Sequence, residues 1–296
     1  MKRMLIVGVG GFCGRHLEAY FRRSSWEVVG YSSLQGEGLD RETGRWRGEF
    51  GIPEGTEVVL YLSQSPYYHS GRERVEHLLS VNYLSAVKAA DLSWRAGVKK
   101  WIYFSTGSVY RDVGGGPFRE GAPLDRENWY SLSKIHGEEA LSLFRDRMSV
   151  VVLRLFGVYG PGQREKFIPR LVERIGASRP VVLHPREGEE VVEGLRISLC
   201  YIRDLAQVVE QVVEDEDPPF CLNVASDEVI TLRQAACKIG ESLGKEVRFE
   251  LSEEPRNKDL VADIGRLRRR YGVEFTPFAR GIESVVKEWL AGRGGG

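Results

Sequence analysis

A tyrosine and a lysine that stand four residues apart, Tyr130 and Lys134, have the clearest capacity for proton transfer in this sequence. On a helix, residues four positions apart share one face, so the phenol and the ammonium would be neighbours. A phenol ordinarily titrates near about pH 10, and nearby positive charge favours its ionised form. Tyr130 could then act as a base that takes a hydroxyl proton while hydride leaves the same carbon. An ordinary helix with a packed tyrosine and a surface lysine would carry the same spacing.

Hydroxyl side chains gather at the end of the apolar segment 101–105, where Ser105, Thr106 and Ser108 stand close together. We expect this segment to be a strand of a parallel sheet, and ligands bind at the carboxyl ends of such strands. A hydroxyl group placed there can hydrogen-bond a substrate oxygen and stabilise its developing charge. On these grounds alone, all three hydroxyls are candidates.

A glycine-rich segment, with Gly8, Gly11 and Gly14 at intervals of three, separates a predicted strand from a predicted helix. Glycine permits the tight turn and lets the backbone approach a pyrophosphate, which the N–H groups at the helix start can bind. The intervening Phe12 and Cys13 would contribute such N–H groups. The alternative interpretation is an ordinary strand–helix turn, but its position in a strand–turn–helix unit favours dinucleotide binding.

The second predicted strand ends at Tyr31 without the acidic residue that reads the ribose of NAD. A carboxylate would repel the 2′-phosphate of NADP, and none stands here. Ser32 and Ser33 could donate hydrogen bonds to that phosphate, and Arg15 could lie near it. The sequence therefore leaves NAD and NADP open and favours NADP.

Strands and helices alternate in the first half of the chain, which predicts an α/β fold with a doubly wound (Rossmann) parallel sheet. The expected strands are 4–7, 27–31, 58–62, 101–105 and 150–155, and the expected helices are 12–23, 72–96 and 130–146. The segment 32–56 interrupts this rhythm, so either a degenerate strand or a loop occupies it.

The second half has shorter elements and predicts a smaller substrate-binding part. The expected helices are 166–175, 203–213, 232–243 and two more at the C-terminus, and the expected strands are 181–183, 197–202, 220–224 and about 247–251. The prediction divides the chain into a dinucleotide-binding domain, 1–160 with 195–224 returning to it, and a substrate-binding part, 161–194 and 225–296.

Composition excludes several other classes of protein. Lysine plus arginine and aspartate plus glutamate each number 42, so no overall charge attracts the chain to nucleic acid or to an acidic membrane. The four cysteines fit no zinc spacing, and we assign no metal. Polar surroundings explain His69, His77 and His136 better than catalysis does. Without a run of about 18 apolar residues, the chain is expected to be cytoplasmic with no membrane partner.

The chain resembles the extended short-chain dehydrogenase/reductases, specifically the NAD(P)-dependent nucleotide-sugar epimerase/dehydratase group, over nearly its whole length. The motifs that carry the resemblance are Gly8-x-x-Gly11-x-x-Gly14, Val81-Asn82, Ser105-Thr106-x-x-Val109-Tyr110, Tyr130-x-x-x-Lys134, 153–162, Tyr201-Ile202-x-Asp204-Leu205-Ala206, 223–226 and Arg256-x-x-Asp259. The resemblance implies that Thr106 is the catalytic hydroxyl and Tyr130 the base, and that Lys134 also holds the nicotinamide ribose.

The resemblance also implies roles for residues outside this trio. Leu62, Ser63 and Gln64 would lie along the cofactor, Asn82 would support the site, and Arg256 would face the diphosphate of a nucleotide sugar. The helices near 72–96 and 130–146 would form the face of a homodimer. The predicted cofactor-binding residues are Gly8, Gly11, Phe12, Cys13, Gly14, Ser32, Ser33, Leu62, Ser63, Asn82, Ser105, Tyr130 and Lys134. The predicted substrate-binding residues are Gln64, Thr106, Ser108, Gly157, Arg196 and Arg256.

Departures from the family pattern narrow the expected reaction. Gly107 and Ser108 occupy the two positions where 4,6-dehydratases carry Asp-Glu, so we disfavour dehydration. Gly157 stands where the family often has Asn. A second phosphate-binding arginine is usual at Ile197, and Arg196 stands one place away, so the substrate need not carry a standard nucleoside diphosphate. Trp129 replaces the usual proline before the tyrosine.

Three functions remain open at this stage. The first is a nucleotide-sugar epimerase, which returns its hydride and needs no net supply of cofactor. The second is an NADPH-dependent ketoreductase on a related substrate, which consumes cofactor in each cycle. The third is a catalytically silent nucleotide-binding protein, against which the complete set of Thr106, Tyr130 and Lys134 argues.

Overall fold

The computed structural model describes residues 2–36, 38–48, 50–68, 74–114 and 116–293. His69 lies outside the described residues. The chain forms two compact units. The first consists of Met1–Arg111, Gly121–Arg154 and Val208–Leu222, and the second of Asp112–Glu120, Leu155–Gln207 and Asn223–Gly296. The sequence assigned dinucleotide binding to one part of the chain and substrate binding to the other. This assignment and its boundaries stay predictions.

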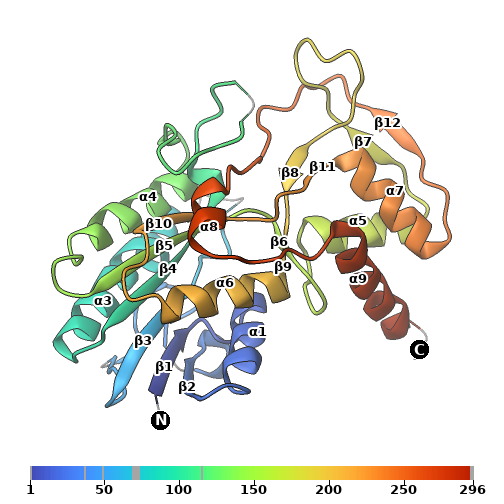
Figure 1. Cartoon of the computed structure of the whole chain (residues 1–296). Helices are drawn as coiled ribbons and strands as arrows, with labels where there is room; N and C mark the ends of the chain where they lie inside the picture. Colours follow the sequence, from blue (N-terminus) through green and yellow to red (C-terminus); the bar gives the residue numbers. More distant parts are fainter. Residues whose placement is uncertain (1, 37, 49, 69–73, 115, 294–296) are drawn as a thin grey trace. The chain divides into compact units, whose positions relative to one another are not determined.

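A six-stranded sheet forms the centre of the fold, in the order β10-β5-β4-β3-β1-β2 (Figure 1). Its strands are β1 (Lys2–Val7), β2 (Trp26–Tyr31), β3 (Thr56–Tyr61), β4 (Lys100–Thr106), β5 (Ser149–Leu155) and β10 (Cys221–Val224). β1 runs parallel to β2 and β3, and β3 runs parallel to β4. The middle strands are apolar and almost completely buried, as expected for a parallel sheet covered on both faces. The predicted doubly wound fold is confirmed.

Helices cover the two faces of this sheet (Figure 1). α3 (Ser85–Arg95) and α4 (Trp129–Ser142) lie on one face, and α1 (Phe12–Phe21) and the end of α6 (Ile202–Glu214) lie on the other. On the α3 side, the stacked rings of Tyr61, Trp101 and Tyr103 fill the core. The buried ammonium of Lys100, at the start of β4, donates to carbonyl groups at the end of α6. These contacts attach the helices to the strands that carry the site.

The described residues between β2 and β3 form a loop, which settles the alternative that the sequence left open for 32–56. Its described residues hold one short 3₁₀ turn, η1 (Ser33–Gln35), and an isolated bridge between Leu39 and Trp46. The Trp46 ring stacks on Phe50, and its indole N–H donates to the Ser85 carbonyl at the start of α3. The order of the strands changes direction at β1, because β2 lies on one side of it and β3 and the later strands lie on the other. Ligands of such folds bind at this reversal, beyond the carboxyl ends of the strands.

The described part of the predicted helix 72–96 consists of three consecutive pieces. α2 (Val75–Leu79) is followed by a π-helical turn, η2 (Ser80–Leu84), and then by α3. π turns inside helices are uncommon and occur often at functional sites. This turn holds Asn82, whose side chain is fully buried, and its position is described below with the site.

The second unit contains short strands and longer helices. Its elements are β6 (Val158–Tyr159), α5 (Phe167–Gly176), β7 (Val181–Leu183), β8 (Arg196–Ser198), β9 (Cys200–Tyr201), β11 (Val229–Thr231), α7 (Leu232–Leu243), β12 (Phe249–Leu251), α8 (Gly265–Arg270) and α9 (Phe278–Arg293). Three two-stranded sheets pair β6 with β9, β8 with β11, and β7 with β12. The sequence did not predict β6 and β11, because strands of two or three residues carry too little periodicity.

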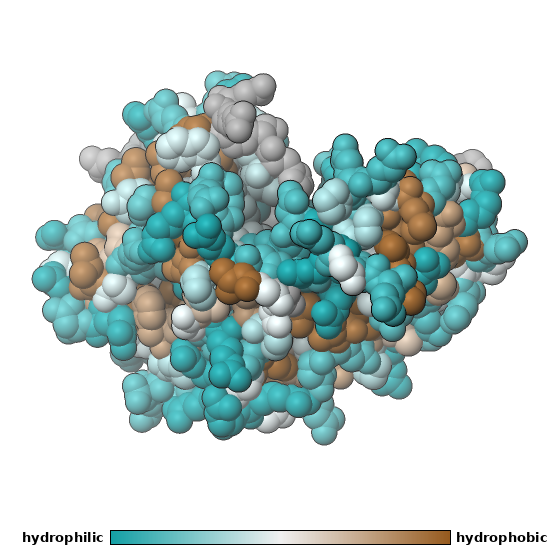
Figure 2. Space-filling model, turned by 90° about the horizontal axis from the view of Figure 1, so that it is seen from above, coloured by the Kyte–Doolittle hydropathy of each residue, from teal (hydrophilic) through white to brown (hydrophobic). Residues whose placement is uncertain are grey.

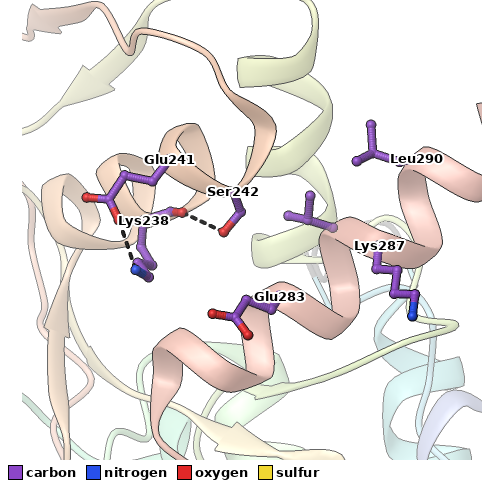
Figure 3. Close-up of a pocket in the computed structure, with 7 residues that line it drawn as sticks. Lys238, Glu241, Ser242, Glu283, Lys287 and Leu290 are labelled. Atoms are coloured by element: carbon purple, nitrogen blue, oxygen red, sulfur yellow. Dashed lines mark hydrogen bonds and ion pairs between the residues drawn. The ribbon is translucent and has the colours of Figure 1, made fainter.

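α7 packs between α5 and α9. A hollow of about 420 Å³ lies between α7 and α9 (Figure 3). Charges of both signs line it: Lys238 pairs with Glu241 at 2.9 Å, and Glu283 and Lys287 come from α9. Hydrophilic side chains cover most of the face seen in Figure 2, with hydrophobic ones in scattered groups. In the described part of the chain, no helix combines the length and apolar character needed to cross a membrane.

Candidate functional site

The glycine turn after β1 is packed so tightly that side chains are excluded from it. Gly8 has a φ of 97°, and a Cβ atom there would lie 2.9 Å from the Ser63 backbone nitrogen. A Cβ at Gly14 would lie 2.7 Å from the Cα of Val9 and closer still to the Gly8 carbonyl oxygen. Glycine is therefore required for the turn itself and for the close approach of α1 to it.

The N-terminus of α1 is open toward this turn. α1 begins after Gly11, which has an extended backbone and no side chain to cap the helix. The N–H groups of a helix's first turn lack partners within the helix and attract negative charge. The turn therefore fits the pyrophosphate of a dinucleotide, as predicted for Gly8, Gly11, Phe12, Cys13 and Gly14, whose roles stay proposals.

Two hydrogen bonds bring the ends of the neighbouring strands to the same turn. The Gly8 N–H donates to the Tyr31 carbonyl at 2.8 Å, and the Leu62 N–H donates to the Val7 carbonyl at 2.8 Å. The ends of β1, β2 and β3 therefore meet here, with Leu62 and Ser63 beside the glycine turn. Their predicted contact with the cofactor stays a proposal.

At the end of β2, Ser32 is buried and its hydroxyl accepts a hydrogen bond from the Leu34 N–H at 3.2 Å. A Cβ at Gly10 would overlap this hydroxyl, so Ser32 packs directly against the glycine turn. Ser33 is half-buried, and the exposed Arg15 donates to the Gly10 carbonyl at 2.7 Å. That Ser32 and Ser33 bind the adenosine ribose side of a cofactor stays a proposal.

The N-terminus of α4 is attached to the turn that holds Thr106. Asn128 caps α4 by accepting from the Ser131 N–H at 2.8 Å. The Ser131 hydroxyl donates to the Ser108 carbonyl at 2.9 Å. Thr106 in turn caps the 3₁₀ turn η3 (Gly107–Val109) by accepting from the Ser108 N–H at 3.1 Å. This chain of caps fixes the end of β4 against the first turn of α4.

Asn82 joins three parts of the site from the π turn. Its side-chain oxygen accepts from the Ser65 N–H at 3.3 Å, and its side-chain nitrogen donates to the Ser133 hydroxyl at 2.9 Å. Its carbonyl also accepts a hydrogen bond from the Tyr103 hydroxyl. Asn82 therefore holds the loop after β3, β4 and α4 together. This supports a positioning role and leaves direct cofactor contact by its side chain as a proposal.

The phenol of Tyr130 lies among the predicted polar groups. Its hydroxyl donates to the side-chain oxygen of Gln64 at 3.2 Å. The centres of the Tyr130 and Tyr68 rings lie 5.7 Å apart. Burial raises the pKa of Tyr130 to about 12, and the nearby Thr106 hydroxyl opposes this rise. The structure thus brings Thr106, Tyr130 and Gln64 together, with the phenol protonated at neutral pH.

Lys134 follows Tyr130 by one helical turn and is almost completely buried. Its ammonium donates to the Phe104 carbonyl at 2.9 Å and lies 4.8 Å from the centre of the Tyr103 ring. Burial lowers the pKa of Lys134 to about 7, and the negative charge of Glu138 opposes this fall. The side chain therefore changes charge near neutral pH, where an ordinary lysine stays protonated.

Replacing Lys134 with methionine is expected to stabilise the fold while removing activity. Between pH 7 and 10.5, the unfolded chain holds the lysine proton and the folded chain releases it, so this group's contribution to stability rises with pH. Below pH 7 the folded protein bears the full cost of burying the charge. Methionine fills a similar volume without a charge, so Tm should rise by several degrees at pH 6 and by less at pH 9.

Thermal unfolding followed by circular dichroism at both pH values checks this prediction. Lys88→Met, at an exposed position of α3, serves as the control and should show no such pH dependence. An equal change of Tm at pH 6 and pH 9 for Lys134→Met would contradict the depressed pKa.

The side chain of Ser105, a predicted cofactor contact, donates a hydrogen bond into the protein interior. Successive side chains of a strand point to opposite faces, so Tyr103 and Ser105 share the face that α4 covers. The Ser105 hydroxyl is buried and donates to the carboxylate of Glu138 on α4. Its side chain therefore serves the interior, and a cofactor contact through its backbone stays a proposal.

Sequence reasoning missed a buried ion pair beneath these residues. Glu138 on α4 accepts from Arg154 on β5 through both carboxylate oxygens, at 3.1 and 3.2 Å from Nε. Arg154 also donates to the Tyr110 hydroxyl at 2.8 Å. One signal was available, because Glu138 repeats the four-residue interval of Tyr130 and Lys134 on the same helix face.

The predicted substrate residues of the second unit have particular local environments. Gly157 has a φ of 44°, in the left-handed region that glycine and asparagine tolerate, which explains why glycine can replace the family's asparagine. The exposed Arg196 donates through its backbone N–H to Asp259 at 3.0 Å. These observations leave both roles as proposals.

Arg256 is bound by acidic partners within the second unit. It pairs with Glu189 through two nitrogens at 2.6 and 2.8 Å, with Asp259 at 2.8 Å, and with the His184 carbonyl at 3.1 Å. A substrate diphosphate would have to displace Glu189 to reach these donors. The predicted diphosphate contact therefore stays a proposal that requires an exchange of partners.

His77 has a local structural role. Its Nε2 donates to the Arg41 carbonyl at 3.0 Å, and burial lowers its pKa, so the neutral ring accepts from the Ser65 hydroxyl at 2.9 Å. His136 lies on α4 beside the Tyr83 ring. No group of three His, Cys, Asp or Glu side chains suited to a metal ion occurs among the described residues.

Comparison with known proteins establishes the family. The model of the NAD dependent epimerase/dehydratase family matches residues 4–225, and the chain belongs to this family. The chain is 26% identical over 251 residues to a dTDP-D-glucose 4,6-dehydratase of Mus musculus, with 80% of this chain and 68% of that protein covered. The predicted family and its NAD(P)-dependent chemistry are thereby confirmed.

Solved structures share the fold. The chain is similar to the UDP-glucose 4-epimerase of Thermus thermophilus in complex with NAD, with a TM-score of 0.79, 22% identity, and 97% and 99% of the two chains covered. It is also similar to RMD of Pseudomonas aeruginosa complexed with NADPH, with a TM-score of 0.80, 18% identity, and 98% and 100% covered. Proteins of this fold thus include examples with either cofactor.

Proposed function

We propose that the chain is a nucleotide-sugar epimerase that oxidises a sugar hydroxyl to a ketone and reduces it again from the other side. One observation carries the proposal: the Tyr130 phenol and the Thr106 hydroxyl lie together at the end of β4, in the same unit as the glycine turn. A bound nicotinamide would supply the acceptor and donor of hydride.

The residues of the site would move the proton. Tyr130 takes the proton of the substrate hydroxyl as the carbon is oxidised and returns it when the ketone is reduced. Its pKa of about 12 is too high for this task, so additional positive charge is required. The ring of an oxidised nicotinamide is the proposed additional source, beside the Lys134 ammonium one helical turn away. Thr106 donates a hydrogen bond to the substrate oxygen.

The turn after Thr106 favours epimerisation over dehydration. Elimination of water needs an acid and a base beside the sugar, and the family's dehydratases place Asp-Glu there. Gly107 and Ser108 stand in these positions, and Gly107 is buried in the 3₁₀ turn. We therefore propose no elimination step, although a 4,6-dehydratase is among the relatives of the chain.

For the cofactor we propose NADP. The end of β2 offers Ser32 and Ser33, no carboxylate follows Tyr31, and the exposed guanidinium of Arg15 lies at the glycine turn. A 2′-phosphate would gain hydrogen bonds and meet no repulsion there. The Thermus epimerase was solved with NAD, so the affinity of this chain for both cofactors should be measured.

The absence of a carboxylate directly after β2 also favours a second candidate, an NADPH-dependent ketoreductase. Reductases draw on NADPH, and RMD of similar fold was solved with it. The proton chemistry of Thr106, Tyr130 and Lys134 would be unchanged. Only the fate of the hydride separates the two functions.

Cofactor stoichiometry is the test. The protein is incubated with UDP-, dTDP- and GDP-linked sugars and a small, fixed amount of NADP or NAD, and products are followed by proton NMR. The epimerase proposal predicts many turnovers per cofactor and no net change in the absorbance of the reduced cofactor. Conversion of a 4-keto sugar with one NADPH consumed per product would identify the reductase. Binding of cofactor without turnover of any sugar would support the third function, a catalytically silent nucleotide-binding protein.

The substrate-binding roles of Gln64, Ser108, Gly157, Arg196 and Arg256 belong to this proposal. We also propose a homodimer through the helices around α3 and α4, on the basis of the family resemblance. A cytoplasmic location is proposed from the sequence.

A further inference from the structure

Three charged side chains of unit 1 form a buried cluster behind Tyr130. Lys134 and Glu138 follow each other by one turn of α4, and Arg154 enters from β5. All three are nearly inaccessible to solvent, with 1%, 4% and 6% of their surfaces exposed. Burying a charge costs free energy unless partners compensate it, and Glu138 is the one negative charge of this cluster.

The cluster holds Glu138 from several directions. Arg154 binds its carboxylate through Nε and Nη2, and Ser105 donates to it from β4. Arg154 is fixed in turn by the Tyr110 hydroxyl and ring, at 2.8 Å and 4.9 Å. The carboxylate therefore has one defined position, one helical turn below the lysine.

Arg154 pairs with this carboxylate directly, and Lys134 lies one helical turn away from it on α4. The negative charge of Glu138 raises the pKa of both Lys134 and Arg154 against the effect of burial. The other titratable groups near the cluster are the phenols of Tyr61, Tyr103, Tyr110 and Tyr130 and the thiol of Cys221. Burial raises the pKa of Tyr61, Tyr103 and Tyr130, so these phenols supply no negative charge at neutral pH.

We propose that Glu138 is a positioning residue which, held by Arg154 and Ser105 one helical turn from Lys134, keeps the Lys134 ammonium charged for the nicotinamide ribose and for Tyr130. This inference rests on the proposed cofactor site. It goes beyond that site because Glu138 touches neither substrate nor cofactor and acts through the lysine. A purely structural ion pair would join α4 to β5 without affecting the charge of Lys134.

The test is the pH dependence of NADPH affinity in Glu138→Gln, measured by fluorescence titration from pH 5 to 9. The amide keeps the shape of the side chain and removes its charge. Without that charge Lys134 loses its proton at lower pH, and each pKa unit lowers its charged fraction about tenfold above the pKa. We expect NADPH affinity to equal the wild type at pH 5 and to fall about tenfold below it at pH 8.

Three further variants separate charge from structure. Glu139→Gln, the exposed neighbour on the same helix, should follow the wild-type curve. Glu138→Asp keeps the charge and should restore most of the affinity at pH 8. Ser105→Ala removes one of the donors that fix the position of the carboxylate, and a less firmly placed charge stabilises the Lys134 ammonium less, so it should shift the curve in the same direction as Glu138→Gln by a smaller amount. It also provides the test if Glu138→Gln does not fold.

Wild-type affinity in Glu138→Gln across the pH range would overturn the inference, as would an equal loss at pH 5 and pH 8, the signature of a structural ion pair. In the Ser105→Ala protein, an unshifted curve would do the same. Because binding is measured without a sugar, a failure of the proposed epimerase activity would show separately, as absence of turnover in a wild-type protein that still binds NADPH.

Discussion

Replacing Tyr130 with phenylalanine is expected to lower kcat by about 10²–10⁴-fold, the usual contribution of a positioned general acid–base group. The substitution removes the side-chain atom that would exchange a proton at this position and keeps the ring packed beside Tyr68. The hydrogen bond to Gln64 disappears as well, but Gln64 is exposed and can be solvated by water. Cofactor affinity should therefore remain within a few-fold of the wild type.

Steady-state kinetics on the sugar identified by NMR measure kcat, and NADPH titration measures the cofactor affinity. Tyr83→Phe is the matched control, because this half-buried tyrosine contacts His136 and has no predicted role in the reaction. Retention of more than about a tenth of the wild-type kcat in Tyr130→Phe would remove the assigned base.

Replacing Gly14 with alanine is expected to disrupt the cofactor site and to destabilise the fold by about 1–3 kcal/mol, the usual cost of overpacking. The new methyl group would meet the backbone of Gly8 and Val9, with the Val9 Cα only 2.7 Å away. Backbone cannot move aside as a flexible side chain can, so α1 must shift away from β1. NADPH affinity should fall by at least about tenfold, because the N–H groups of α1 move with it.

Urea denaturation and NADPH titration check both effects. Gly121→Ala is the control, since a Cβ there meets nothing within 4 Å and its φ lies outside the left-handed region. If Gly14→Ala bound NADPH like the control, the glycine turn could not be the pyrophosphate site.

The fold and the centre of the site follow from local patterns that a sequence displays. The apolar strands at 4–7, 58–62 and 101–105 and the helix at 130–146 correspond to β1, β3, β4 and α4. Because parallel strands end at one edge, residues distant in sequence could be assigned to the same site. The meeting of Tyr130, Gln64 and the glycine turn in one unit is a consequence of that geometry.

The features of the site that could not be predicted from the sequence depend on burial and on contacts between distant residues. Glu138 resembles any polar residue of an amphipathic helix until Arg154, from a separate strand, is found against it. The π turn at Asn82 has no sequence signature, and its contacts with Ser65 and Ser133 join residues that are distant in the sequence. The acidic partner of Arg256, Glu189, lies 67 residues away and gave no local sign of its position.

The central claim is that Tyr130, Lys134 and Thr106 face a nicotinamide whose pyrophosphate lies on the glycine turn. A crystal structure of the chain with NADP(H) bound tests it most directly. We predict that the pyrophosphate contacts the N-terminus of α1, that Lys134 reaches the nicotinamide ribose, and that the Tyr130 hydroxyl lies beside the nicotinamide ring. A nicotinamide bound away from Tyr130, with the phenol and ammonium still turned to Gln64 and the Phe104 carbonyl, would contradict the account.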